Sequence, residues 1–131
     1  MIAAAGLPDA VTLLGSVTQD AVRAELQSAD SFVLASRHEP LGVAYMEAMA
    51  CQLPVIGTDA GGVRELITEG RDGLLVPPDD AEALAAAMAR MMEDRDLRRS
   101  LGRAARQRIL ADFSSRRSAD ALAAALAGDR P

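Results

Sequence analysis

The chain has 131 residues, of which 50% are hydrophobic and 25% charged, and its formal net charge is -5. This composition predicts one soluble globular domain over residues 1–131, and the acidic balance argues against nucleic acid and anionic membrane surfaces as partners. Cys51 is the single cysteine and no apolar run is long enough to span a membrane, so we expect a cytoplasmic protein without disulfides or a cysteine-based metal cluster.

The first part of the chain predicts two strands joined by a helix. Residues 11–14 (VTLL) form a short apolar run closed by Gly15, which favours a buried strand. Thr18 can cap a helix that continues to about Ala29. Residues 31–35 (SFVLA) then predict a second strand. The helix is long enough to serve as the crossover between two parallel strands.

The middle of the chain continues this alternation of helices and strands. Helical patterns cover residues 42–51 and 63–67. Short apolar runs at residues 54–57 (PVIG) and 74–76 (LLV) predict two further strands. Each run is bounded by glycine or proline, as is typical of strands that end in loops.

From about residue 79 onward the chain predicts helices only. Asp79 and Glu82 have the spacing of a capping box at the start of the first helix. Apolar residues then recur at helical spacing through residues 84–92, 97–109 and 119–126. We therefore expect three consecutive helices in this segment.

Apolar strands that alternate with helices predict an α/β fold. We expect a Rossmann-like parallel sheet of about four strands with helices on both faces. In such sheets, ligands bind in the crevice beyond the carboxyl ends of the strands. The loop of residues 36–41 and the loop of residues 59–62 each follow a predicted strand directly. Both loops are therefore expected at that edge.

The groups best suited to bind a ligand lie around the start of the helix predicted after the second strand. The N–H groups of its first turn, near Gly42 and Val43, have no partners within the helix and suit a phosphate. Glu47 lies about one turn deeper, where a carboxylate can accept hydrogen bonds from ribose hydroxyls, and Glu39 could bind another sugar ring. A nucleotide-sugar fits this series. The plainer alternative is that both glutamates are solvated and the glycine pair at residues 61–62 is a simple turn.

The stretch from residue 36 to residue 65 and its continuation resemble a known family. The similar family is that of the retaining glycosyltransferases of GT-B fold (glycosyl transferases group 1 type), in their C-terminal, donor-binding half. The resemblance extends from about residue 11 to residue 126. Its matching residues are Ala35, Ser36, Glu39, Gly42, the runs 47–51 and 53–56, Thr58, Gly61, Gly62, Glu65, Gly70, the run 73–78, Leu101, Gly102, the run 104–106, Phe113 and Ser114.

The resemblance implies a role for each glutamate. In this family the first glutamate of the pair contacts the transferred sugar, and the second contacts the ribose. Backbone amides after the first glutamate contact the sugar and the phosphates. The nucleotide-sugar is a substrate, and neither a cofactor nor a metal ion is implied. The implied catalytic residue is Glu39, and the implied donor-binding residues are Glu39, Leu41, Gly42, Val43, Glu47, Gly61 and Gly62.

Two positions depart from the family pattern. Gln52 stands where the family usually has glycine after the helix, so its backbone is expected to reach a left-handed conformation at some strain. Leu41 stands where phenylalanine is common, which would alter the pocket for the donor sugar.

Full members of the family contain more than this chain. The resemblance implies that an N-terminal acceptor-binding domain and two strands before residue 11 are missing, and that this fragment is inactive by itself. The strand at residues 31–35 would then have an open edge that invites self-association. In a compact monomer we expect the strand at residues 11–14 to pair directly with it, since the crossover helix is already in place.

Three functions are open at this stage. The first is the donor-binding half of a retaining glycosyltransferase of polysaccharide or glycolipid biosynthesis. The second is a non-catalytic module that binds nucleotides or nucleotide-sugars. The third is an association module whose Ala- and Met-rich helices pack on a partner chain.

Overall fold

A parallel sheet lies at the centre of the protein, for which a computed structural model describes residues 6, 9–114 and 116–117. The sheet contains β1 (Phe32–Leu34), β2 (Val55–Thr58) and β3 (Leu74–Val76) in the order β1-β2-β3. All neighbours are parallel, with Val33 opposite Ile56 and Gly57 opposite Leu75. The carboxyl ends of the strands therefore meet at one edge.

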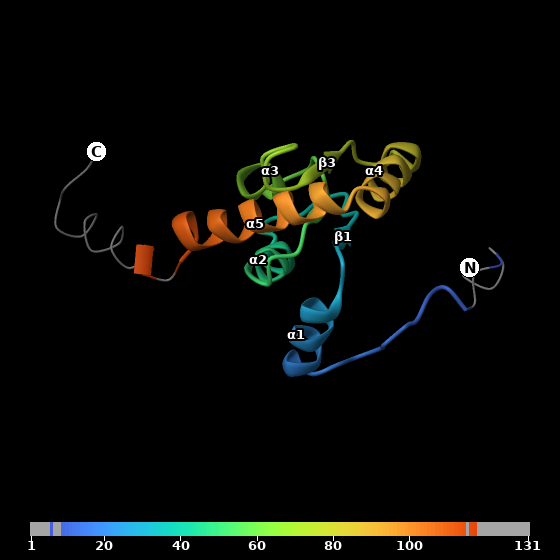
Figure 1. Ribbon diagram of the computed structural model, residues 1–131, viewed down its shortest axis with the longest axis horizontal. Helices are drawn as coiled ribbons and strands as arrows, with labels where there is room; N and C mark the ends of the chain where they lie inside the picture. Colours follow the sequence, from blue (N-terminus) through green and yellow to red (C-terminus); the bar gives the residue numbers. More distant parts are fainter. Residues whose placement is uncertain (1–5, 7–8, 115, 118–131) are drawn as a thin grey trace.

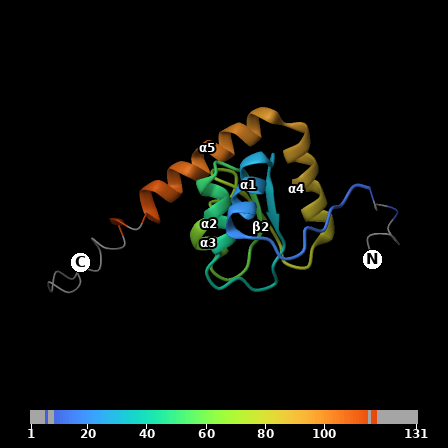
Figure 2. The ribbon, with the colours of Figure 1, turned by 90° about the horizontal axis from the view of Figure 1, so that it is seen from below.

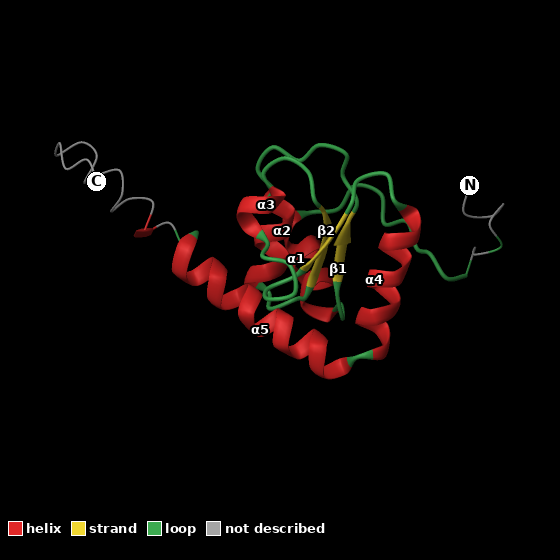
Figure 3. Ribbon diagram, turned by 90° about the horizontal axis from the view of Figure 1, so that it is seen from above, coloured by secondary structure: helices red, strands yellow, loops and turns green. Residues whose placement is uncertain are grey.

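The described residues contain five helices (Figure 1). Helix α4 lies on one face, α2 and α3 lie on the other, and α5 crosses the amino-terminal edge beneath both layers (Figures 2 and 3). Helix α1 sits apart from the sheet, beside α2, and none of its residues is fully buried. The bounds are α1 (Gln19–Ser28), α2 (Val43–Ala50), α3 (Val63–Leu66), α4 (Ala81–Glu93) and α5 (Arg95–Asp112).

The two faces of the sheet hold two hydrophobic clusters. Alternate residues of a strand point to opposite faces. Accordingly Val55 packs with α2 and α3, whereas its neighbour Ile56 packs with α4. Helix α5 contributes to both, with Leu101 in the α4 cluster and Ile109 in the α2 cluster. The prediction of an α/β protein with helices on both faces is confirmed.

The prediction of about four strands was wrong at residues 11–14. These residues form no strand, their apolar side chains are exposed, and Leu13 is 80% exposed. The expected pairing with β1 is therefore absent, and the described chain before α1 extends away from the sheet (Figure 1). The outer edge of β1 has no neighbour among the described residues. Because Phe32 N–H donates to Pro54 O, the backbone groups of Val33 face that open edge.

Side-chain caps fix where three helices begin. Thr18 Oγ1 accepts from Ala21 N at 3.3 Å, as expected from the sequence. The predicted cap of α4 was wrong by one residue, because Asp80 rather than Asp79 accepts from Ala83 N, at 2.9 Å. Asp94 caps α5 in the same way, through Leu97 N at 2.8 Å. The helix predicted at residues 119–126 lies outside the described residues.

Tyr45 of α2 ties the helix to the sheet. Its side chain is fully buried, its hydroxyl donates to Leu34 O, and its ring meets Phe32 edge-on at a centroid distance of 5.6 Å. Gly57 of β2 leaves room for the ring, because a Cβ there would lie 2.9 Å from the Tyr45 hydroxyl oxygen. Burial raises the pKa of Tyr45 from 10.0 to about 12, and the nearby Glu39 carboxylate adds to the rise.

The raised pKa of Tyr45 predicts a loss of stability in alkali. The folded protein favours the neutral phenol, so this contribution is complete below pH 10 and disappears as the pH rises to about 12. The shift corresponds to about 3 kcal/mol of unfolding free energy. Tyr45 is the only tyrosine and tryptophan is absent, so the ultraviolet absorbance of the phenolate reports this residue alone. Tyr45→Phe should flatten the dependence of unfolding free energy on pH in this range; an unchanged slope would contradict the assignment.

Candidate active site

Two loops pack against each other at the carboxyl edge of the sheet, at the top of Figure 3. The first, residues 35–42, follows β1, and the second, residues 59–62, follows β2. Gly62 N donates to Glu39 O at 2.8 Å. At Gly61, where φ is 60°, a Cβ would lie 2.4 Å from Glu39 O. The sequence therefore places glycine where the second loop supports the backbone of Glu39.

The Glu39 carboxylate lies at the amino-terminal end of α2. Its Oε1 accepts from Gly42 N at 2.9 Å and from Leu41 N at 3.4 Å. Gly42 is the N-cap of α2 in a left-handed conformation, with φ 75°. A Cβ at this position would lie 2.4 Å from Leu66 Cδ1 of α3. Glu39 thus already satisfies two of the amides that the sequence suggested for an anion.

The following amides are still available to a ligand. The N–H groups of Val43 and Ala44, the first two residues of α2, have no acceptor within the described part of the chain. The side chains of Leu41 and Val43 are exposed beside them. Partial positive charge at a helix start favours an anion here. With a phosphate bound there, the Glu39 side chain would lie next to the group that is bonded to this phosphate.

Glu47 lies apart from this group. It sits in the second turn of α2, half-buried, and lines a pocket of about 300 Å³ formed with Asp20, Arg23 and Leu26 of α1. Its carboxylate makes no hydrogen bond or ion pair to the described residues. The expected crevice is therefore present in part: Glu39, Gly42 and the glycine pair at residues 61–62 are in contact, whereas Glu47 borders the α1 side.

A second hollow at the same edge was not identified from the sequence. It measures about 520 Å³ and lies between the ends of the three strands and the start of α4. Arg37 Nε donates to Asp79 Oδ1 at 2.7 Å across its rim, and this bond raises the pKa of Arg37. Thr58, which is buried, donates from its hydroxyl to Ser36 O. The sequence feature that could have indicated this hollow is the pair of adjacent aspartates, Asp79 and Asp80. One aspartate is enough to cap a helix, so the other is free to make a different contact.

The described residues contain neither a metal-ligand cluster nor a membrane-spanning helix. No three His, Cys, Asp or Glu side chains among them are placed to hold a metal ion. No helix in this part of the chain is long and apolar enough to cross a membrane.

The comparisons with known proteins give the class of the chain. The profile of the family described as "Glycosyl transferases group 1" matches residues 1–108. The chain belongs to this family. Among curated proteins it is 32% identical over 123 residues to the alpha-D-kanosaminyltransferase of Streptomyces kanamyceticus, covering 94% of this chain and 32% of that protein.

Solved structures agree with this assignment. The sucrose-phosphate synthase of Thermosynechococcus elongatus matches with a TM-score of 0.87 and 33% identity, over 98% of this chain and 33% of the other. HepE of Anabaena in complex with UDP-glucose matches with a TM-score of 0.88 and 26% identity, over 97% of this chain and 35% of the other. These neighbours are GT-B glycosyltransferases. The chain spans about a third of the length of each of these three proteins.

Proposed function

We propose that this chain is the donor-binding part of a glycosyltransferase that moves a sugar from a nucleotide-sugar to an acceptor with retention of configuration. The observation that carries the proposal is the Glu39 carboxylate at the start of α2, beside the unpartnered amides of Val43 and Ala44. Membership of the glycosyltransferase family supports it. The similarity to HepE, which was solved with UDP-glucose, supports a nucleotide-sugar as the donor.

Each residue of the site has a role in this proposal. The amides of Leu41, Gly42 and Val43 bind the sugar and the diphosphate, and they stabilise the charge that develops on the leaving nucleotide diphosphate. Glu39 contacts the transferred sugar, so the hydrogen bonds that its carboxylate makes to Leu41 N and Gly42 N rearrange when the donor binds. Glu47 accepts hydrogen bonds from the ribose hydroxyls, for which its unpartnered carboxylate is available.

The glycine pair acts on Glu39 through the backbone. Gly62 N–H holds Glu39 O, and Gly61 allows the close approach of the two loops. These glycines are positioning residues in the proposal. The donor is the substrate, and the proposal requires no cofactor belonging to the protein.

The proposal also includes a missing partner. In the proposal, an acceptor-binding domain completes the cleft and additional strands cover the open edge of β1. This agrees with the fact that the chain spans only about a third of the length of its relatives. The chain alone is then inactive and self-associates through that edge. Sugar transfer by the purified chain, or a monomer in size-exclusion chromatography at high concentration, would contradict this part. A cytosolic location and a role in polysaccharide or glycolipid synthesis belong to the same proposal.

Titration of the chain with UDP and with UDP-glucose tests the two glutamates separately. Glu47→Ala should weaken both ligands alike, by roughly 1–3 kcal/mol, because a hydrogen bond to a charged group is lost. Glu39→Gln should weaken UDP-glucose more than UDP. The amide is preferable to alanine here because its oxygen can still accept from Gly42 N, so the start of α2 is kept.

The control for this titration is Glu93→Ala, an exposed glutamate at the end of α4. It should leave both affinities unchanged. Equal losses for both ligands in both site variants would refute the separate roles of the two glutamates. Absence of binding by the folded wild-type chain would favour the association module in place of a donor-binding domain.

A further inference from the structure

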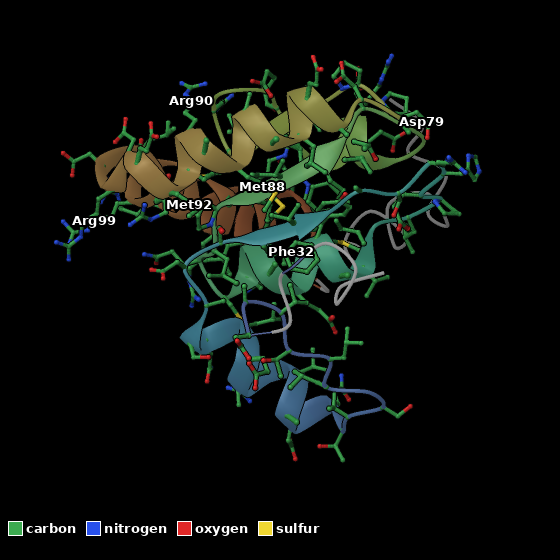
Figure 4. All side chains as sticks on the ribbon, turned by 90° about the vertical axis from the view of Figure 1, so that its right-hand side faces the viewer. Phe32, Asp79, Met88, Arg90, Met92 and Arg99 are labelled. Carbon is green, nitrogen blue, oxygen red and sulfur yellow. The ribbon has the colours of Figure 1, made fainter. Side chains whose placement is uncertain are left out.

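Four arginines line a pocket at the amino-terminal edge of the sheet, away from the donor site. The pocket measures about 530 Å³ and lies where α5 begins, against the ends of α1 and α2. In Figure 4, Arg99 and Asp79 stand at opposite ends of the molecule, Asp79 being at the carboxyl edge. The charged and amide side chains that line the pocket are Arg95, Arg98, Arg99, Arg106, Asp30, Gln52 and Gln27.

Two of these arginines are held in place by helix ends. Arg98 donates from Nη1 to Met91 O at 2.6 Å and to Met92 O at 2.8 Å, near the end of α4. Arg106 donates to Ala50 O, the last residue of α2, at 2.6 Å. Carbonyl groups at the carboxyl end of a helix carry partial negative charge, which accounts for one arginine at the end of each of these two helices. Their guanidinium groups are therefore fixed around the pocket.

The other two arginines have no partner of this kind. Arg95 and Arg99 are exposed and form neither a hydrogen bond nor an ion pair with the described residues. Both lie on the first turns of α5, one turn apart, on the side that faces the pocket. Figure 4 shows Arg99 projecting from the end of the helical layer. No hydrogen bond or ion pair within the described part of the chain explains why they are arginine.

The charge around the pocket is unbalanced. Four guanidinium groups face one carboxylate, that of Asp30. The carboxyl-terminal ends of α1, α2 and α4 and the amino-terminal end of α5 together contribute about one negative charge, at about half a charge per helix end. The Asp94 carboxylate, which caps α5, offsets one more charge, so a local surplus of about one positive charge remains. It lies in a chain whose net charge is -5, so the whole-chain charge conceals it.

We propose that this pocket binds a phosphate-bearing anion. The planar guanidinium forks match phosphate oxygens in pairs, and two of the four are already held in place. A volume of about 530 Å³ accommodates a phosphorylated small molecule. Donors bind at the carboxyl edge of such sheets, so this ligand is distinct from the nucleotide-sugar. The proposal therefore stands independently of the donor site.

Inorganic pyrophosphate is a suitable probe, titrated into the full chain by calorimetry. We expect binding that weakens as the salt concentration rises. The double substitution Arg95→Gln and Arg99→Gln should lower the affinity by about tenfold or more, because two charge-assisted contacts are lost. Neither side chain forms a hydrogen bond or an ion pair with the described residues, so the variant should fold.

The matched control removes the same charge elsewhere. Arg90→Gln with Arg103→Gln changes two exposed arginines of α4 and α5 that do not line the pocket. This variant should keep the wild-type affinity within about twofold, since it removes only long-range attraction. Equal losses in both double variants, or no binding of pyrophosphate to the wild-type chain, would overturn the proposal.

The natural phosphate could belong to a soluble metabolite or to a phospholipid headgroup, and sedimentation with vesicles separates the two sources. Binding to vesicles that contain phosphatidylglycerol, absent with phosphatidylcholine alone and displaced by pyrophosphate, would support the pocket with a lipid headgroup as its ligand. Pyrophosphate binding without sedimentation would support it with a soluble phosphate.

Discussion

Replacing Gly102 with alanine is expected to destabilise the protein by about 2–4 kcal/mol, although alanine is the better helix former. Gly102 lies within α5 and is buried against the turn that follows α2. A Cβ here would lie 2.2 Å from Gln52 O and 3.2 Å from Gln52 C. The obstacle is backbone, which cannot move aside as a flexible side chain does.

The turn opposite Gly102 has little freedom to adjust. Gln52 is in a left-handed conformation, with φ 65°, as the sequence suggested for this departure from the family pattern. Its N–H donates to Met49 O at 2.9 Å, and the next N–H, of Leu53, donates to Ala48 O at 3.1 Å. A displaced Gln52 would therefore disturb the end of α2 and the start of β2 together.

Urea unfolding followed by circular dichroism measures the effect of Gly102→Ala. Helix propensity alone would stabilise the variant by about 1 kcal/mol, so the two influences differ in sign. Ser100→Ala on the exposed side of the same helix is the control and should raise stability slightly. If Gly102→Ala also raised stability, α5 would not pack on the Gln52 turn as closely as the structure indicates.

Three of the four predicted strands form, and the fourth, at residues 11–14, does not. Residues 32–34, 55–58 and 74–76 are short apolar runs, and all three form the sheet. Residues 11–14 are an equally apolar run and remain exposed. Periodicity indicates whether a segment could be buried, but it does not indicate whether the segment docks on a particular strand edge. Residues 11–14 stay unpaired although the outer edge of β1 is open.

The residue that caps α4 could not be predicted from local sequence either. Asp79 and Asp80 are chemically identical, and spacing to Glu82 favoured the first. The structure uses Asp80, while Asp79 has φ 59° and pairs with Arg37 from the loop after β1. Asp79 is instead engaged with a residue 42 positions away in sequence. Local propensity could not include it.

The candidate site was predictable at its centre and less so around it. The spacing of Glu39 and Gly42 placed both at the start of α2, where they are in contact. The same helical reasoning put Glu47 on a common face with Val43, yet α1 packs on that side and forms a pocket with Glu47. The arginine pocket could not be predicted, because its four arginines come from one helix and only the fold brings that helix against the ends of α1 and α2.

Replacing Gly61 with alanine should have the largest effect of any single change at the candidate site. The new Cβ would lie 2.4 Å from Glu39 O, so one of the two loops must move. We expect a loss of about 2–4 kcal/mol in unfolding free energy, combining backbone strain at φ 60° with this overlap. Because Glu39 is displaced, affinity for UDP-glucose should fall more than affinity for UDP.

Gly70→Ala separates the two causes of that loss. Gly70 has φ 72°, so alanine there suffers the same left-handed strain, about 1–2 kcal/mol. No atom lies within 4 Å of its would-be Cβ, so the overlap is absent. Urea unfolding of both variants should therefore show the greater loss for Gly61→Ala, and titration with UDP-glucose should show an effect for that variant alone. Equal losses of stability would mean that the glycine loop does not support Glu39, and that Gly61 serves only the turn in which it lies.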